Sequence, residues 1–255
     1  MALLQIEGVT VQFGGLTAVS DMDMSIEAGQ IHALIGPNGA GKTTLFNVIT
    51  RVIPPSAGSV HLQDKDLLHL QAHETVKVGI TRTFQNLEIF RLMSVQDNLL
   101  VGYHSRIPTH FFSESLQNTF QKGEESKARQ KALQVAGFLG MKNRLASFAG
   151  MLPYGLQKMV EVGRALMSDP VLLLLDEPAA GLNPSETDYL KEKIFEIQKM
   201  GITILLVEHD MSLVMDISNH ITVMNFGKKI AEGSPELIRN HPDVIKAYLG
   251  ESKYA

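Results

Sequence analysis

One stretch, residues 36–43, constrains this chain more than any other. It reads Gly36-Pro37-Asn38-Gly39-Ala40-Gly41-Lys42-Thr43 and fits G-x-x-x-x-G-K-[ST], the pattern of loops that bind nucleotide phosphates. An apolar run at 31–35 precedes it and a helix-compatible run at 44–49 follows, so the strand–loop–helix context is present. In that context backbone N–H groups surround an anion and the positive end of the helix faces it. We predict a phosphate-binding loop; the alternative is a glycine-rich turn that matches by accident.

The pattern also assigns a chemical task to the last two residues of the loop. Lys42 is expected to reach the β- and γ-phosphates of a nucleoside triphosphate, and the Thr43 hydroxyl is expected to hold Mg²⁺.

Length and composition indicate an ordinary globular chain. The 255 residues are enough for one large domain or two small ones, and 44% hydrophobic with 20% charged content is typical of soluble proteins. The net charge of -4 and the scattered basic residues argue against a nucleic-acid-binding face. Cysteine is absent, which excludes disulfides and thiolate metal sites and fits a reducing compartment.

No segment of the sequence predicts secretion or a membrane span. Glu7 interrupts the N-terminal apolar residues before they could form a signal peptide, and no run approaches the ~18 apolar residues of a spanning helix. We expect a cytoplasmic protein whose role at a membrane, if it has one, depends on a partner.

The first part of the chain predicts strands around the phosphate loop. Apolar and polar residues alternate over 4–26 in two runs separated by Gly14-Gly15, which indicates an antiparallel pair. Further on, the sequence predicts a strand at 59–62, a short helix over 72–78 and a strand over 80–84 that ends at Gln85.

The middle of the chain is mostly helical in pattern. From about residue 87 to 166 apolar residues recur near helical spacing, most clearly over 124–139. The segment 104–122 has no assignment; we expect its Phe111 and Phe112 to pack between helices rather than bind a ligand.

The last part predicts a return to α/β structure. The apolar runs 171–175 and 202–207 are typical of strands covered on both faces, and Asn183-Pro184-Ser185-Glu186 opens a helix between them. Two short strands around the Phe226-Gly227 turn and helical pieces to Leu249 complete the chain.

These elements predict an α/β fold: a phosphate-loop NTPase core with a mainly parallel sheet, an N-terminal antiparallel β subdomain and an inserted helical subdomain. The predicted core comprises residues 1–86 and 167–255, and the helical subdomain comprises residues 87–166.

Two acidic residues end the first buried strand of the last part. Asp176 and Glu177 therefore lie at the carboxyl edge of the sheet, where open α/β sheets bind ligands. Asp176 suits a ligand of Mg²⁺, directly or through water, and Glu177 suits polarising a water for attack on the γ-phosphate. The alternative is a solvated acidic pair at a strand end.

Two further polar residues complete the predicted site. His209 follows the strand at 202–207 and can reach the γ-phosphate and hold the attacking water. Gln85 can offer an oxygen to Mg²⁺ or to that water. Taken alone, His209 would be a satisfied loop residue and Gln85 would carry no signal.

The order of these elements resembles the ATP-binding subunits of ABC transporters over essentially the whole chain. The resemblance rests on the phosphate loop, Gln85, the strand with Glu177, and His209, together with two further segments. These segments are Leu152-Pro153-Tyr154-Gly155-Leu156-Gln157, with Gly163-Arg164-Ala165-Leu166 downstream of it, and Ala180-Gly181-Leu182-Asn183.

A closer resemblance is to the ATPases of branched-chain amino-acid importers. It rests on Arg-Thr-Phe-Gln-Asn at 82–86, Leu-Pro-Tyr-Gly at 152–155, Glu-Pro-Ala-Ala-Gly-Leu-Asn-Pro at 177–184 and Val-Glu-His-Asp-Met at 207–211. Urea or short-amide importers use a very similar subunit, and the lipopolysaccharide-export ATPase is a more distant relative, so the solute stays open.

The resemblance implies an ATPase that uses ATP and Mg²⁺ and works in an assembly. Two copies, identical or paralogous, would meet head to tail with ATP between the phosphate loop of one and the segment 152–157 of the other. Membrane-spanning permease subunits would hold the chain at the inner face of the cell membrane, and a solute-binding protein would act indirectly. An apolar groove beside Gln85 would receive a permease helix; the alternative is that its residues serve interior packing. These residues are Leu87, Ile89, Phe90, Leu92 and Met93.

The chain departs from the pattern of the broad family at three places. Where that family has Ser-Gly-Gly-Gln, this chain has Pro153-Tyr154-Gly155-Leu156, so the backbone N–H of Gly155 and the helix start are left to bind the partner's phosphate. Asn183 replaces an aspartate. Phe13 replaces the tyrosine that stacks on adenine, and a role in the hairpin is its alternative.

The predicted residues fall into three sets. The catalytic set is Glu177, His209 and Gln85. The metal-binding set is Thr43, Gln85 and Asp176. The nucleotide-binding set is Phe13, Gly36, Pro37, Asn38, Gly39, Ala40, Gly41, Lys42, Thr43, Thr44 and Gly155.

Two other classes compete with a transport ATPase. A regulatory or DNA-associated ABC ATPase would carry two nucleotide domains or a long coiled coil, and neither is evident in the sequence. A nucleotide-binding module without turnover is disfavoured by Glu177 and His209.

Overall fold

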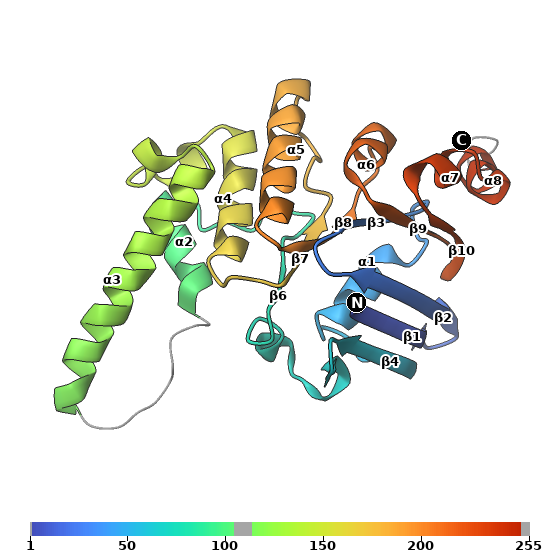
Figure 1. Cartoon of the computed structure of the whole chain (residues 1–255), viewed down its shortest axis with the longest axis horizontal. Coiled ribbons are helices and arrows are strands. Elements are labelled where there is room, and N and C mark those ends of the chain that lie inside the picture. The colour runs from blue at the N-terminus through green and yellow to red at the C-terminus, as the bar shows by residue number, and fades with distance from the viewer. Residues whose placement is uncertain (1, 105–113, 251–255) are drawn as a thin grey trace.

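The computed structural model describes residues 2–104 and 114–250 of the chain. Two sheets and the helices around them form an elongated molecule, with the helices α2, α3 and α4 at one end and α7 and α8 at the other (Figure 1). The predictions for Phe111 and Phe112 lie outside the described residues.

The first sheet is antiparallel and comes mainly from the N-terminal part of the chain. Its strands are β1 (Ala2–Phe13), β2 (Leu16–Glu27), β4 (Ala57–Leu62) and β5 (Lys65–Asp66), in the order β2-β1-β4-β5. Gly14 turns the chain between β1 and β2 with a φ of 57°, a backbone conformation that glycine adopts without strain. The predicted antiparallel pair is confirmed.

The second sheet has six strands in the order β10-β9-β3-β8-β7-β6. Their bounds are β3 (Ile31–Ile35), β6 (Ile80–Arg82), β7 (Leu172–Asp176), β8 (Thr203–Val207), β9 (His220–Asn225) and β10 (Lys228–Gly233). Neighbouring strands from β9 to β6 pair in parallel, and β10 pairs antiparallel with β9. The carboxyl ends of β3, β6, β7 and β8 therefore lie along one edge of the sheet.

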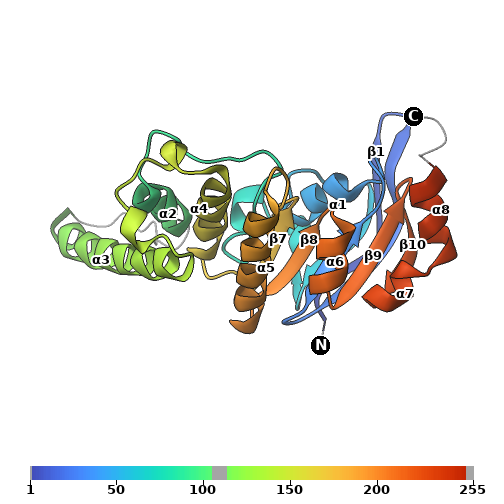
Figure 2. The same cartoon turned by 90° about the horizontal axis from the view of Figure 1, so that it is seen from above.

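The apolar strands of this sheet are covered on both faces. In β7, Leu173 and Leu175 join one core cluster, while Leu172 and Leu174 join another, as the alternation of side chains along a strand requires. The first cluster lies under α5 and α6, and the second contains α1 and the antiparallel sheet. Figure 2 shows these layers from above. This explains why β7 reads as an unbroken run of leucines.

The helices of the α/β part are α1 (Lys42–Ile49), α5 (Pro184–Lys199), α6 (Met211–Ile217), α7 (Pro235–Arg239) and α8 (Pro242–Gly250). The start of α5 is set by a capping box, in which the Asn183 side chain accepts from the Glu186 N–H and the Glu186 carboxylate accepts from the Asn183 N–H. The predicted helix opening at 183–186 is confirmed.

The remaining end of the molecule is formed by α2 (Val95–Tyr103), α3 (Glu114–Phe138) and α4 (Tyr154–Leu166). Helices α2 and α4 pack closely at Gly102, where an added β-carbon would lie only 2.0 Å from the Arg164 carbonyl oxygen. Short 3₁₀ helices occur at Leu67–His69, Ala72–Glu74, Lys142–Arg144 and Ala149–Met151. The domain boundaries at 87 and 166 stay a prediction, since one core cluster joins these helices to the sheet.

Two predicted elements are shorter than expected. The strand over 80–84 ends at Arg82, because the Phe84 N–H leaves the sheet and donates to the Glu161 carboxylate of α4 at 3.0 Å. The helix over 72–78 is only the 3₁₀ turn Ala72–Glu74, followed by turns that lead to Gly79. Across residues 2–104 and 114–250, the structure contains no helix that combines the length and apolarity needed to cross a bilayer.

A histidine lies in the centre of the six-stranded sheet. His32 of β3 is fully buried, with Nε2 at 2.8 Å from Thr222 Oγ1 and Nδ1 at 3.1 Å from Gln30 Nε2. Burial, reinforced by His220, lowers the pKa of His32 from 6.5 to about 3. The folded state therefore keeps His32 neutral, whereas the unfolded chain takes up a proton below pH 6.5. Stability is lost as the pH falls from about 6.5 toward 3.

We expect this histidine to make folding acid-sensitive. Between pH 7.5 and 5.0, His32 should remove about 2 kcal/mol from the free energy of unfolding, since each pH unit below 6.5 is worth roughly 1.4 kcal/mol. The variant His32→Gln should lose that part of the pH dependence, measured by urea unfolding at both pH values. The exposed His73→Gln variant is the control and should retain it. An unchanged pH dependence in His32→Gln would contradict the assignment.

Candidate nucleotide-binding and hydrolysis site

The phosphate loop is shaped by the backbone packed behind it. Gly36 has a φ of 151°, and a β-carbon there would lie 2.1 Å from the Met224 carbonyl oxygen. Gly41, which precedes α1, has a φ of 103°, and a β-carbon there would lie 2.6 Å from the Ala18 carbonyl oxygen. Glycine is required at both positions, because β2 and β9 approach the loop so closely.

The end of the loop carries a buried positive charge. Lys42 is buried and its ammonium group donates to the carbonyl oxygens of Gly36 at 2.6 Å and Pro37 at 3.0 Å. Among the described residues, no side chain caps the start of α1, and its first turn has no acidic residue. The first N–H groups of this helix and its positive dipole end are therefore available to an anion.

A pocket of about 480 Å³ opens over this loop. Its volume is within the range of small-molecule sites. Its walls bring together the phosphate loop, the start of α1 and the segments that follow β6, β7 and β8. The lining residues are Leu16, Thr17, Ala18, Asn38, Gly39, Ala40, Gly41, Lys42, Thr43, Thr44, Gln85, Glu177, His209, Phe226 and Gly227.

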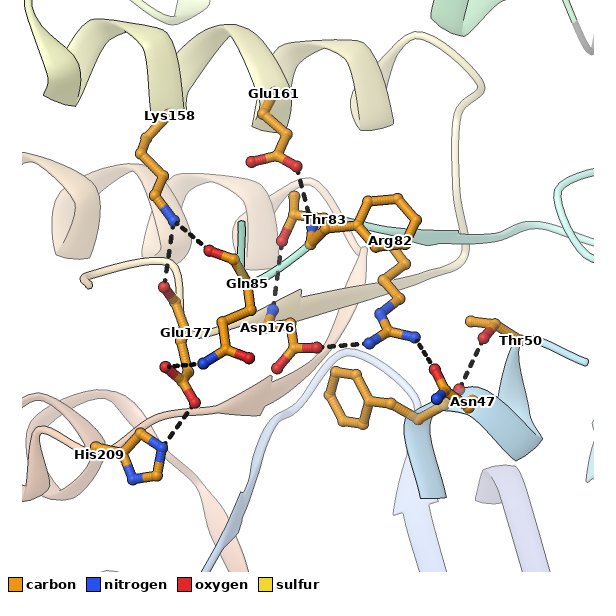
Figure 3. Close-up of polar contacts among 12 residues, drawn as sticks. Asn47, Thr50, Arg82, Thr83, Gln85, Lys158, Glu161, Asp176, Glu177 and His209 are labelled. Carbon is orange, nitrogen blue, oxygen red and sulfur yellow. Dashed lines mark hydrogen bonds and ion pairs between the residues drawn. The ribbon is translucent and has the colours of Figure 1, made fainter. Parts of the chain in front are cut away.

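Glu177 is the centre of the polar cluster on the pocket wall. Its Oε1 lies 2.7 Å from His209 Nε2, and its Oε2 accepts from Gln85 Nε2 at 3.0 Å (Figure 3). Its backbone has a φ of 48°, which is strained for a residue other than glycine, and its N–H donates to the Val207 carbonyl at 2.8 Å. The three residues predicted as catalytic therefore meet through one carboxylate.

Asp176, the last residue of β7, lies one residue before this carboxylate and is only 2% exposed. Its Oδ2 accepts from Arg82 at 2.6 Å. Its Oδ1 is buried and has no hydrogen-bond partner among the residues that the structure describes. A buried carboxylate oxygen without a partner is costly, and a cation or water bound there would offset that cost.

Four predicted nucleotide-binding residues do not line the pocket: Phe13, Gly36, Pro37 and Gly155. Phe13 lies at the end of β1 with 51% of its surface exposed, whereas another aromatic residue, Phe226 at the β9–β10 turn, is 85% exposed and does line it. Gly155 lies in the first turn of α4, where its Cα faces the Glu186 side chain. The roles of Phe13 and Gly155 stay predictions.

Three buried charged residues around the site were not singled out from the sequence. Lys158 of α4 donates to the carbonyl oxygens of Gln85 and Glu177, each at 3.4 Å, so it bridges the two polar segments (Figure 3). Glu161, one turn later, accepts from the Phe84 N–H, and burial raises its pKa. These contacts attach α4 to the backbone beside Gln85. In the sequence, the only signal is a pair of charges on the apolar face of a helix.

Glu208 is the third of these residues. Its carboxylate accepts from the N–H of Ala179 at 2.7 Å and of His209 at 3.0 Å, and burial raises its pKa. It therefore joins the segment after Glu177 to the segment that carries His209.

Comparison with known families agrees with this geometry. The family described as ABC transporter matches residues 19–180, and the family described as branched-chain amino acid ATP-binding cassette transporter matches residues 228–254. The chain therefore belongs to the ABC transporter family, with the fold of its ATP-binding cassettes.

The relatives narrow the group within that family. The chain is 45% identical over 98% of both sequences to the high-affinity branched-chain amino acid transport ATP-binding protein LivG of Escherichia coli. It is 43% identical over 98% of both sequences to the corresponding protein BraF of Pseudomonas aeruginosa.

Solved structures of ABC transporter cassettes share the fold. A nucleotide-free cassette has a TM-score of 0.85 at 33% identity, with 97% of this chain and 99% of that chain covered. A cassette in its ADP conformation has a TM-score of 0.82 at 31% identity, with 98% and 99% covered. The predicted α/β class, with its antiparallel sheet and mainly parallel sheet, is confirmed.

The packing behind the phosphate loop predicts a large difference between two glycine variants. Gly36→Ala should lower the free energy of unfolding by about 3 kcal/mol or more, because it adds a collision with the Met224 carbonyl to backbone strain. Gly29 has a φ of 74° but no atom within 4 Å of an added β-carbon, so Gly29→Ala should cost only about 1–2 kcal/mol. Urea unfolding measures both, and equal costs would contradict the close packing.

Proposed function

We propose that this chain binds ATP with Mg²⁺ over its phosphate loop and hydrolyses it to energise a membrane importer of branched-chain or related amino acids. The observation that carries the proposal is the Glu177 carboxylate, held by Gln85 on one side and His209 on the other at the wall of the phosphate-loop pocket. The branched-chain amino acid transport function of the LivG and BraF relatives supports the choice of solute.

Glu177 is assigned to the attacking water. Phosphoryl transfer needs an oriented nucleophile and compensation of charge more than covalent help from the protein. Because both carboxylate oxygens of Glu177 are held by neighbouring side chains, the carboxylate has one orientation toward the pocket. His209 is assigned to the γ-phosphate and the water, and Lys42 is assigned to the β- and γ-phosphates in place of the carbonyls that it contacts here.

The donor set fits magnesium. Thr43 supplies a hydroxyl, Gln85 an amide oxygen that its bond to Glu177 leaves unused, and Asp176 its unpartnered Oδ1. Magnesium in nucleotide sites prefers oxygen ligands and uses one or two carboxylates with the phosphates. When bound, the ion would neutralise charge on the β- and γ-phosphates, while Thr43, Gln85 and Asp176 orient it.

A second copy of the cassette, identical or paralogous, would complete the site in a head-to-tail dimer. Helix α4 begins at Tyr154 with no side-chain cap among the described residues, so the N–H of Gly155 and its neighbours can bind an anion. Gly155 does not line the chain's own pocket, which supports its assignment to the ATP of the partner copy. The predicted assignment of adenine stacking to Phe13 gains no support from the pocket lining, which instead offers the ring of Phe226 as an aromatic wall.

Permease subunits are assigned to a groove of about 420 Å³ beside Arg82 and α4. Its apolar walls include the exposed residues Val52, Phe84 and Val101. No residue of the apolar cluster predicted from the sequence lines this groove: Ile89 packs on the core, and Phe90 and Leu92 are exposed. A permease helix in the groove would hold the chain at the inner face of the membrane, and a solute-binding protein would act through the permease.

The solute is tested by reconstitution. The chain, co-purified with its membrane subunits in lipid, should hydrolyse ATP faster when a receptor loaded with leucine, isoleucine or valine is added. Receptors loaded with urea or short amides serve as the control and should leave the rate at its basal value. Stimulation by the urea-loaded receptor alone would replace the amino-acid assignment with the urea alternative.

The role of Glu177 is tested by an isosteric change. Glu177→Gln should bind ATP with wild-type affinity, lose at least about 100-fold in hydrolysis rate, and form a dimer that persists with ATP and Mg²⁺. Glu192→Gln on the exposed face of α5 is the matched control and should behave as wild type. Phosphate release and size-exclusion chromatography measure the two effects, and normal turnover in Glu177→Gln would refute the assignment.

A further inference from the structure

We propose that Arg82 is a positioning residue that holds Asp176 so that a single carboxylate oxygen, Oδ1, faces the magnesium ion. The inference rests on the proposed function, because it assumes that Asp176 serves the metal. It concerns a residue outside the predicted metal-binding set, which lies behind Asp176 and lines the groove assigned to the permease rather than the nucleotide pocket.

The guanidinium group of Arg82 connects two side chains. Nη2 donates to Asp176 Oδ2 at 2.6 Å, and Nη1 donates to Asn47 Oδ1 at 2.6 Å (Figure 3). The Arg82 and Asp176 side chains are 8% and 2% exposed, so water screens their attraction little. Two short bonds from one planar group fix its position and, through Oδ2, the rotation of the Asp176 carboxylate.

Two aromatic rings further restrict the guanidinium. Its central carbon lies 5.4 Å from the centre of the Phe46 ring and 5.3 Å from the centre of the Phe84 ring. Both distances are within the range of favourable cation–π contacts. Phe46 is completely buried in α1, so that side of the guanidinium has no room to move.

The bonds around Asp176 select the oxygen that remains for a ligand. Arg82 occupies Oδ2, and the Asp176 N–H donates to Thr83 Oγ1 at 3.3 Å. Oδ1 alone stays without a partner among the described residues, although it is buried. The arginine therefore compensates the charge of the carboxylate and leaves one oxygen for the ion or its bound water.

The contacts of Arg82 with Asp176 and Asn47 also fix the position of the metal-binding carboxylate relative to the phosphates. Arg82 ends β6, which pairs in parallel with β7 so that Arg82 lies opposite Leu174. Asn47 lies in α1, the helix whose first residue is Lys42. Arg82 thus connects the strand end that carries Asp176 with the helix that follows the phosphate loop. Lysine cannot reproduce this, because its single ammonium lacks the planar fork that spans both partners.

The test measures metal binding apart from hydrolysis. All variants are made in the Glu177→Gln background, so that ATP is retained. Two quantities are measured: ATP affinity in EDTA by competition with a fluorescent ATP analogue, and Mn²⁺ affinity of the ATP complex by electron paramagnetic resonance of free Mn²⁺. Arg82→Met should weaken Mn²⁺ binding by about 10- to 100-fold and change ATP affinity in EDTA by less than about twofold.

Matched variants separate positioning from general damage. Arg82→Lys should recover part of the Mn²⁺ affinity because it restores the charge, and Asn47→Ala should weaken Mn²⁺ binding several-fold because Arg82 loses an anchor. Arg51→Met is the control: Arg51 is another partly buried arginine, bonded to the carbonyls of Leu68 and Leu70, and its loss should leave both affinities unchanged.

A further variant distinguishes failure of the inference from failure of the proposed function. Asp176→Asn should weaken Mn²⁺ binding; if it does not, the assignment of Asp176 to the metal is wrong. If Asp176→Asn weakens Mn²⁺ binding but Arg82→Met does not, the positioning role is refuted alone. If Arg82→Met does not fold, Arg82→Lys and Asn47→Ala serve as the test of the positioning role. A Mn²⁺ affinity in both variants equal to that of the Glu177→Gln background would refute the inference.

Discussion

The parallel pairing of β3, β8, β7 and β6 is the constraint on which the rest of the structure depends. Parallel strands have their carboxyl ends at one edge, so the phosphate loop, His209, Glu177 and Gln85 leave the sheet on the same side. Parallel strands also need helices on both faces, which explains why β7 and β8 are apolar throughout and why polar residues begin where they end.

Buried charges connect this edge to the surrounding elements. Arg82 bonds to Asp176, Lys158 bridges the backbone of Gln85 and Glu177, and Glu208 joins the segments after β7 and β8. A buried ion pair adds little net stability, because desolvation offsets most of the attraction, but removing one partner is strongly destabilising. The arrangement therefore specifies geometry more than stability. It also makes the positions of α4 and of the Glu177 segment dependent on each other.

Much of the fold was predictable because its signals are local. The leucine run of β7, the Gly14 turn and the cap of α5 each act within a few residues, and all three are confirmed. The end of β6 was not predictable, because the Phe84 N–H is taken by Glu161, which lies 77 positions further along the chain. The three catalytic predictions meet in one cluster, whereas Arg82 and Glu208 gave no local signal of their role.

The sequence by itself determined the class of protein, the phosphate loop and the order of polar residues that follow the strands, because these depend on short patterns and strand ends. Only the tertiary structure decided which groups touch. It placed Glu177 between Gln85 and His209, left one oxygen of Asp176 without a described partner, and put Phe226 rather than Phe13 on the pocket wall. Contacts between distant segments depend on how the chain packs in three dimensions. The spacing of residues along the sequence does not specify the distances between such segments.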